Sequence, residues 1–433
     1  MRNFYPFPVE NIETFKLQLL EISNAVKHFC YLDSNNYPNY PYSTFGSLFA
    51  IDAIDVISVN TNCLEQFEKF QQKYNDWMFG FLNYDLKNEL ESSLISNNID
   101  NIQNPLLHFF VPKYILKIEN DKVEIGVLSE SENESESLLI EFKNLLQNKT
   151  IESQIINHKS EILHRISKQD YINTIQKIKQ HIQLGDIYEL NFCQEFYVEN
   201  AEINPVAVFK KLNEISKAPF TSFFKNEQNY LLCASPERFL KRQNNTLISQ
   251  PIKGTRKRNK DKKEDNLLKQ QLFFDEKERS ENVMIVDLVR NDFSKIAIKN
   301  SVEVDELFGI YSFEQVHQMI STVSCKIENP LSFSDIIKAV FPMGSMTGAP
   351  KIAAMQLIEM YEPTKRGLFS GAVGYITPKG NFDFNVVIRS ILYNSTNNYI
   401  SIQTGSAITI DCDAEKEYEE CLLKAKAMIE VIS

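Results

Sequence analysis

The stretch SKQDYINTIQKIKQHIQLGDIYELNF, residues 167–192, decides the fold class, because it passes from a helical to a β-type pattern within a few residues. Isoleucines recur every three or four positions from Ile172 to Ile182, which is the spacing of one helix face. Ser167 can cap the start of this helix, and Gly185 can end it. The run IYELNF follows directly and is typical of a strand. The stretch therefore predicts a fold that mixes helices and strands.

Short β-rich runs continue to alternate with long helical runs beyond this stretch, so we expect the second part of the chain to carry the chemistry. The first part mixes a helical pattern at residues 11–30 with an aromatic, β-rich run at residues 76–86. Between the two parts, SESENESES at residues 129–137 has almost nothing to bury, which predicts a solvated loop or linker. We therefore predict an N-terminal lobe over residues 1–150 and a catalytic domain over residues 160–433.

Composition argues against several classes of protein. The chain has 433 residues and a formal net charge of −11, which would repel a nucleic-acid backbone. Its first residues do not look like a secretory leader, and no apolar run approaches the ~18 residues of a membrane helix. Seven cysteines without a CxxC pair favour a reducing, cytoplasmic setting, and the six histidines lack zinc-ligand spacing. A bound metal should therefore have oxygen ligands.

Two pairs of glutamates are candidate metal ligands. Glu278 and Glu281 lie in EKERSENVMIVDLV, whereas Glu417 and Glu420 lie in DAEKEYEECLLKAKAMIEVI, and both runs have a helical pattern. The i, i+3 spacing places each pair on one helix face. Four carboxylates brought together would need a hard cation such as Mg²⁺. Solvated surface glutamates are the alternative interpretation.

Two loops and two further side chains could face a ligand. FPMGSMTGAPK (341–351) lacks the spacing of a nucleotide-binding P-loop, but it leads into a helix whose first amides could hold a carboxylate. QTGSAIT (403–409) would let backbone amides approach a ligand, although a tight turn explains either loop. In PIKGT (251–255), Lys253 is either a surface lysine or a nucleophile whose pKa is lowered by burial or cationic neighbours. His317 is either a core histidine or an acid–base group.

Eight segments, in this order, resemble the chorismate-utilising enzymes, a family that includes anthranilate synthase component I, aminodeoxychorismate synthase component I, and isochorismate and salicylate synthases. Together they span essentially all of residues 168–430, and the N-terminal lobe matches more loosely. The resemblance implies an α+β fold in which two large, mainly antiparallel β-sheets pack as a sandwich with flanking helices, with the active site in a cleft between the layers. The segments are GDIYELNF (185–192), ASPERFL (234–240), PIKGTRKR (251–258), ENVMIVDLVRND (281–292), FPMGSMTGAPK (341–351), RGLFSGAVGYI (366–376), FNVVIRS (384–390) and EKEYEECLLKAKA (415–427).

Within this family, the residue before Gly-Thr in the PIxGT segment separates the activities. Anthranilate synthases carry Ala there, aminodeoxychorismate synthases carry a nucleophilic Lys, and this chain has Lys253. The resemblance therefore implies conversion of chorismate and ammonia to 4-amino-4-deoxychorismate, on the way to p-aminobenzoate and folate. Anthranilate synthase component I is the alternative within the class, and a non-catalytic regulatory relative is the alternative outside it.

The resemblance also implies a mechanism. The amine of Lys253 would attack ring C2 of chorismate as the C4 hydroxyl leaves, and Glu237 would protonate that hydroxyl as a general acid. Ammonia would then add at C4 and expel the lysine. For these roles, burial should shift the pKa values of both groups towards neutrality.

The remaining site residues are likewise implied by the resemblance. Mg²⁺ would be held by Glu281 and Glu420, with Glu278 and Glu417 nearby, and would bind the ring carboxylate of chorismate. His317 would support catalysis. Substrate-binding or supporting positions would be Gly254, Thr255, Thr347, Phe369, Arg389, Gly405, Ser406, Ala407 and Lys424.

Three positions depart from the usual residues of the family. Glu189 stands where aminodeoxychorismate synthases usually have Gln and where isochorismate or salicylate synthases have a water-activating Lys, which argues against water addition. Phe369 replaces a common Tyr, and Ala407 replaces a Gly, so contacts to the substrate carboxylates should differ in detail. No glutaminase domain fits within 433 residues, so ammonia should come from a separate glutamine amidotransferase subunit or from solution.

Overall fold

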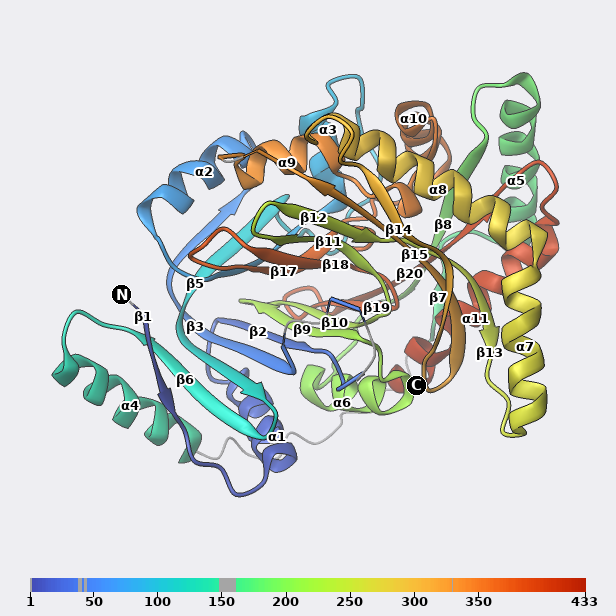
Figure 1. Ribbon diagram of the computed structural model, residues 1–433. Helices are drawn as coiled ribbons and strands as arrows, with labels where there is room; N and C mark the ends of the chain where they lie inside the picture. The colour runs from blue at the N-terminus through green and yellow to red at the C-terminus, as the bar shows by residue number, and fades with distance from the viewer. Residues whose placement is uncertain (1, 38–40, 43–44, 148–160, 329) are drawn as a thin grey trace.

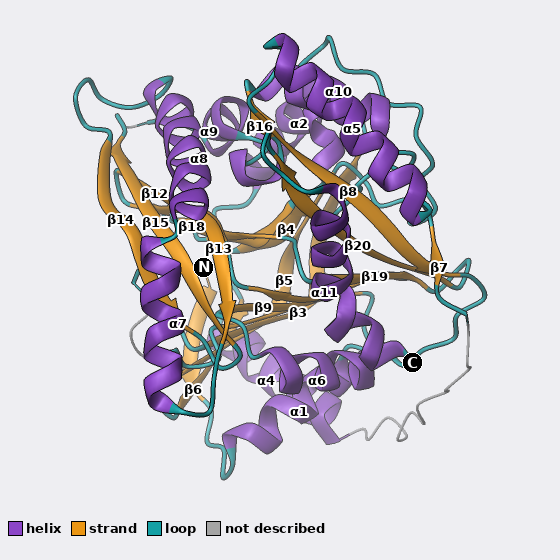
Figure 2. Cartoon of the chain, turned by 90° about the vertical axis from the view of Figure 1, so that its right-hand side faces the viewer, coloured by secondary structure: helices purple, strands orange, loops and turns teal. Residues whose placement is uncertain are grey.

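The computed structural model describes the chain except for residues 1, 38–40, 43–44, 148–160 and 329. Over the described part, twenty strands form one continuous hydrogen-bonded sheet, and all pairs between these strands are antiparallel. The sheet divides into two arms with helices around them (Figures 1 and 2). The α+β class with large, antiparallel sheet structure is confirmed, and the two predicted sheets are the two arms of one continuous sheet.

The long strand β5 (Leu107–Glu119) joins the two arms. β3 (Ser47–Val59) pairs with β5 along its whole length. On the opposite edge, the first residues of β5 pair with β4 (Met78–Leu82), whereas its last residues pair with β6 (Lys122–Leu128). The sheet therefore divides at β5, because one edge of this strand serves two different partners.

Each arm continues through antiparallel neighbours. The first arm runs from β1 (Arg2–Pro6) through β6, β5, β3, β2 (His28–Asp33), β9 (Phe220–Asn226), β10 (Asn229–Ser235), β19 (Ser390–Asn394) and β20 (Tyr399–Ile408) to β8 (Glu189–Val198), which also pairs with β7 (Leu163–His164) and β16 (Gly348–Ala349). The second arm runs from β4 through β17 (Ala372–Ile376), β18 (Phe382–Val386), β11 (Arg238–Gln243) and β12 (Thr246–Gln250) to β15 (Val316–Lys326), which also pairs with β13 (Ile252–Lys257) and β14 (Glu303–Ser312).

The N-terminal strands belong to both arms. β2 pairs with β9, and β4 pairs with β17, so each arm combines early and late parts of the chain. The predicted domain boundary, between residues 150 and 160, lies outside the described residues. The division into two domains therefore stays a prediction.

The largest hydrophobic core contains buried side chains from both arms, among them Phe109 and Phe224 from the first arm and Val323 and Phe384 from the second. None of the described helices is long and apolar enough to cross a membrane. The helices are α1 (Ile12–Ile22), α2 (Cys63–Lys73), α3 (Lys87–Leu90), α4 (Glu132–Gln147), α5 (Lys168–Leu184), α6 (Pro205–Ser216), α7 (Lys262–Phe274), α8 (Glu276–Ser294), α9 (Phe333–Val340), α10 (Lys351–Tyr361) and α11 (Ala414–Ile432).

Local sequence signals predict α5 correctly, but they predict a loop or linker where α4 begins. The Ser167 side chain caps α5 by accepting a hydrogen bond from the Asp170 amide, and Gly185 ends the helix with φ +87°. The predicted linker at residues 129–137 instead begins α4. Acidic residues favour a helix N-terminus, and the buried Phe142 gives this helix an apolar contact, so a Ser/Glu-rich run can still start a packed helix.

Candidate active site

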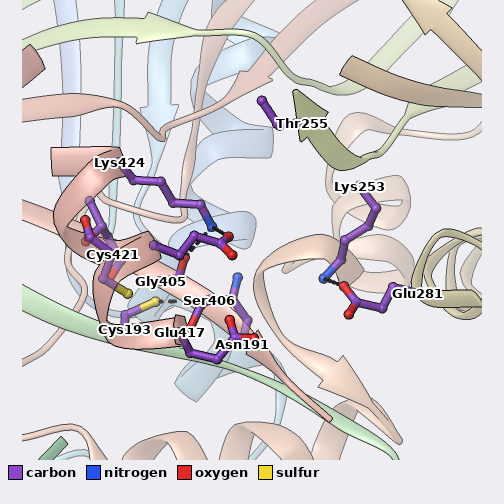
Figure 3. A network of polar contacts seen from close by, with 12 residues as sticks. Asn191, Cys193, Lys253, Thr255, Glu281, Gly405, Ser406, Glu417, Cys421 and Lys424 are labelled. Carbon is purple, nitrogen blue, oxygen red and sulfur yellow. Dashed lines mark hydrogen bonds and ion pairs between the residues drawn. The ribbon is translucent and has the colours of Figure 1, made fainter. Parts of the chain in front are cut away.

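A cleft of about 1060 Å³ brings together segments that are far apart in the sequence. Its walls include β13 and α8 on one side and β20 and α11 on the other, as Figure 3 shows. Of the predicted site residues, only His317 and Thr347 are absent from the lining. The predicted residues that line the cleft are Glu237, Lys253, Gly254, Thr255, Glu278, Glu281, Phe369, Arg389, Gly405, Ser406, Ala407, Glu417, Glu420 and Lys424.

Lys253 lies on β13 with only 11% of its side chain exposed. Its Nζ donates a hydrogen bond of 2.6 Å to Glu189 Oε1 and lies 3.9 Å from Glu281 Oε2. Burial favours a neutral amine, but the two carboxylates outweigh burial and hold the pKa of Lys253 above its ordinary value. The expectation of a pKa shifted towards neutrality is therefore wrong for this arrangement, because Glu189 supplies a negative charge that the sequence reasoning did not place there.

Glu237 lies between β10 and β11 and is 4% exposed. Its backbone is held on both sides, since its amide donates to Ser235 Oγ at 3.2 Å and its carbonyl accepts from the Val386 amide at 3.0 Å. Burial raises the pKa of Glu237 to about 7. The expected direction is found, and the side chain can carry a proton near neutral pH.

The four candidate metal ligands face one another from two helices. Glu278 and Glu281 lie on α8, and Glu417 and Glu420 lie on α11. Burial and neighbouring carboxylates raise the pKa values of Glu278, Glu281 and Glu417. Burial opposes the charge of Glu420 as well, but Lys424 outweighs it and lowers the pKa of Glu420. The four carboxyl groups together form a donor set suited to a divalent cation.

Lysines neutralise part of this acidic cluster in the structure. Lys277 Nζ lies 3.7 Å from Glu281 Oε1 and 3.4 Å from Glu417 Oε1, and Lys424 Nζ lies 2.7 Å from Glu420 Oε1. Glu281 Oε1 is buried and accepts no hydrogen bond from any residue that the structure describes. As the side chains stand, no three His, Cys, Asp or Glu groups among the described residues are placed to hold a metal ion. The oxygen chemistry fits Mg²⁺, and its binding stays a prediction.

β20 and α11 make the opposite wall of the cleft. Lys424 Nζ donates to the Gly405 carbonyl at 2.7 Å, which ties the helix to the strand (Figure 3). A Cβ on Gly405 would lie 2.5 Å from both Asn191 Oδ1 and Cys193 Sγ, so a larger residue there would have to displace these two side chains. Arg389, also in the lining, has φ +52°, and burial lowers its pKa.

His317 and Thr347 lie outside the cleft lining. His317 is 2% exposed, with Nε2 3.0 Å from Asp265 Oδ1 and Nδ1 2.8 Å from Ser312 Oγ. These contacts connect β15 to α7. Thr347 is fully buried, and its hydroxyl donates to the Gly344 carbonyl at 3.1 Å. The structure does not bring either side chain together with the other site residues.

The sequence reasoning missed two groups on β8. Glu189, noted only as a departure from the family, contacts Lys253 directly, and Asn191 lines the cleft and donates to the Ser345 carbonyl at 3.0 Å. Alternate residues of a strand share a face. The alternation in IYELNF could therefore have predicted that Glu189 and Asn191 point the same way.

Comparison with known proteins identifies the family of the chain. The chorismate binding enzyme family matches residues 28–430 of the chain. A probable chloroplastic aminodeoxychorismate synthase of Oryza sativa subsp. japonica is 38% identical over 286 residues, which cover 65% of this chain and 32% of the relative. The match therefore spans about a third of that relative's length. Aminodeoxychorismate synthase component 1 of Bacillus subtilis (strain 168) is 29% identical over 378 residues, which cover 86% of this chain and 79% of the relative.

The fold also has close structural counterparts. Anthranilate synthase component I from Streptococcus pneumoniae TIGR4 superposes with a TM-score of 0.79 at 24% identity, over 90% of this chain and 95% of that chain. At this identity the likeness concerns the fold alone. The family match covers nearly the whole chain and includes every residue of the cleft, so this chain belongs to the chorismate-binding enzymes.

Proposed function

We propose that the chain is component I of an aminodeoxychorismate synthase, which forms 4-amino-4-deoxychorismate and water from chorismate and ammonia. One observation carries the proposal: a buried lysine amine, Lys253, lines the same cleft as Glu237, a carboxyl whose pKa is about 7. The relatives named as aminodeoxychorismate synthases support it. An anthranilate synthase is expected to have no nucleophile at position 253.

The proposed reaction uses a nucleophile and an acid on one ring. The neutral amine of Lys253 forms a bond to ring C2, the ring double bonds shift, and the C4–O bond breaks. The proton of Glu237 goes to the departing oxygen, which leaves as water. Ammonia then forms a bond to C4 as the C2–Nζ bond breaks. The proton that Lys253 loses and the proton that Glu237 regains balance through solvent.

We also propose that Mg²⁺ is the cofactor, held by Glu281 and Glu420 with Glu278 and Glu417 nearby. When bound, it would supply positive charge to the ring carboxylate of chorismate. The guanidinium of Arg389 is a second cationic group in the cleft and has a geometry suited to carboxylates. These groups would give an acidic chain a local site for a dianion.

We further propose that a separate glutamine amidotransferase subunit supplies the ammonia in a cytoplasmic setting. The naming of the Bacillus subtilis relative as component 1 supports a partner subunit. All seven cysteines are free and buried, which is the usual state in a reducing compartment.

Product analysis tests the proposed function. The protein is incubated with chorismate, Mg²⁺ and an ammonium salt, and the products are identified by mass spectrometry. We expect aminodeoxychorismate as the main product, and none in a matched reaction without ammonium. Anthranilate, salicylate or isochorismate as the main product would overturn the proposal.

A further inference from the structure

Only one of the two carboxylate oxygens of Glu189 has a hydrogen-bond partner among the described residues. The residue is 1% exposed, and its Oε1 accepts the 2.6 Å hydrogen bond from Lys253. Its Oε2 is buried and has no hydrogen-bond partner among the described residues. A buried carboxylate oxygen without a donor is costly, so native structures seldom keep one without a reason.

The backbone around Glu189 is fixed. Ala349 of β16 pairs with Glu189, and the Tyr188 amide donates to the Ala349 carbonyl at 2.7 Å. Gly348 packs against the Glu189 carbonyl so closely that a Cβ would not fit. The backbone that carries this carboxylate is therefore held independently of Lys253.

The proposed reaction removes the partner of this carboxylate. While Nζ of Lys253 is bonded to ring C2, it is no longer an ammonium group lying on Glu189. A buried carboxylate that loses its cation is strongly destabilised unless another cation replaces it. Ammonium, the reactant needed next, has the same charge and the same N–H donors as the head of a lysine.

We propose that Glu189 is the ammonium-binding residue of the cleft, holding the Lys253 head group before the reaction and the ammonium substrate once the lysine is bonded to chorismate. This inference rests on the proposed function. The bound ammonium first gives one proton to Glu189 Oε2, and the lone pair of the resulting ammonia then forms the bond to C4 as the C2–Nζ bond breaks and its electron pair returns to Nζ. The released amine of Lys253 takes that proton and restores the ion pair.

A binding experiment tests this subsite without turnover. The Lys253→Ala variant uncovers Glu189, so ammonium chloride should raise its melting temperature above the value in sodium chloride of equal ionic strength. The Lys253→Ala/Glu189→Gln double variant should melt at the same temperature in both salts. Equal responses of the two variants to ammonium would overturn the proposal.

Steady-state kinetics provide the second test. Glu189→Gln should raise the KM for ammonium at least about tenfold, since one buried charge-assisted contact is lost. The KM for chorismate should change less than about twofold, because the proposal gives Glu189 no contact with chorismate. Glu189→Asp, which keeps the charge, should recover part of the ammonium affinity.

Glu195→Gln is the matched control. Glu195 is also a buried glutamate of β8, but it pairs with Arg165 outside the cleft lining. An ammonium KM that is unchanged in Glu189→Gln, or raised equally in Glu195→Gln, would overturn the proposal. If the unaltered protein forms no aminodeoxychorismate, the proposed function fails, and the ammonium-dependent melting of Lys253→Ala still decides the subsite.

Discussion

At the scale of single residues, Glu237 links burial to a pH limit on the chemistry. Burial raises its pKa to about 7, so the protonated form is present at neutral pH and lost above it. A general acid must carry its proton when the leaving group departs. Below about pH 7 the step that breaks the C4–O bond should speed up as more Lys253 becomes neutral, and above it the loss of the Glu237 proton should offset this gain, so the rate should level off.

The first prediction concerns this step alone. In the absence of ammonium, the rate of lysine adduct formation from chorismate should rise up to about pH 7 and stay level above it, as followed by intact-protein mass spectrometry. Glu237→Gln should lower that rate about 10²- to 10⁴-fold, and the rate of the variant should keep rising above about pH 7 with the neutral fraction of Lys253. The same levelling near pH 7 in the variant would show that another group titrates.

The two reactive groups also show how far the sequence reasoning reaches. The direction of the pKa shift of Glu237 was predictable, because burial dominates it. The direction of the pKa shift of Lys253 was not predictable, because it depends on Glu189, which lies on another strand 64 residues earlier. The residues around Lys253 in the sequence do not indicate which side chains the folded sheet places beside it.

At the scale of secondary-structure elements, two ion pairs of equal length have very different surroundings. The pair between Arg366 and Glu362 and the pair between Lys69 and Glu65 are both i, i+4 contacts of 2.6 Å. The side chains of the first pair are 1% and 3% exposed, and those of the second are 72% and 66% exposed. Arg366 also donates to the Asn191 carbonyl at 2.7 Å, which ties the segment after α10 to β8.

The second prediction uses this contrast. Arg366→Met should lower the free energy of unfolding by about 3 to 5 kcal/mol, because it leaves Glu362 charged and buried. Lys69→Met should cost less than about 1 kcal/mol. Urea denaturation measures both values, and similar losses in the two variants would contradict the role of burial.

The strand β5 carries a histidine that cannot be solvated. His108 is fully buried, neither of its ring nitrogens has a hydrogen-bond partner among the described residues, and it packs against the rings of Phe81 and Phe224. Burial and the neighbouring His28 lower the pKa of His108 to about 3. Between about pH 3 and 6.5, His108 therefore binds a proton in the unfolded chain, where its pKa is ordinary, but not in the folded protein.

The third prediction follows from this difference. The stability contributed by neutral His108 should be complete above about pH 6.5 and should be lost as the pH falls towards 3. Each pH unit in that range should cost about 1.4 kcal/mol. Urea titrations from pH 7 to 5 should show a shallower loss in His108→Phe than in the unaltered protein, with His181→Gln as a control.

Elements were predictable where the signal is local. The helices α5, α8 and α11 follow from helical sequence patterns, with Ser167 and Gly185 as additional end signals for α5, and the two glutamate pairs lie on α8 and α11 as expected. α4 was missed because its first turn is composed of Ser and Glu. The neighbours of each strand could not be derived from the residues alone, because β2 and β4 pair with strands far along the chain.

At the scale of the whole molecule, the charge around the cleft differs from the net charge of the chain. The chain has a net charge of −11, yet four exposed lysines line the cleft and have no carboxylate within 4 Å in the described residues. An unpaired basic rim attracts an anionic substrate over several ångströms and raises its rate of encounter. The four are Lys257, Lys260, Lys416 and Lys426.

The fourth prediction tests this rim. Replacing all four lysines with Gln should lower kcat/KM for chorismate about tenfold at low ionic strength and leave kcat unchanged. The difference from the unaltered protein should shrink as salt is added. A matched control replaces four exposed lysines outside the cleft lining, Lys122, Lys143, Lys177 and Lys299. An equal loss of kcat/KM in this control would contradict electrostatic steering by the cleft lysines.

The pairing of β4 with β17 constrains how the protein can be made. During synthesis, β4 and the adjoining part of β5 emerge long before β17 exists, so their free edge waits while most of the chain is translated. Contacts between such distant segments form slowly. A nascent or truncated chain would present an unpaired, apolar strand edge, which is the form that associates with other chains. The cleft is completed later still, because its lining includes residues of β20 and α11, which follow β17 in the chain. Production of folded protein should therefore depend on chaperones that cover this edge until β17 has been made.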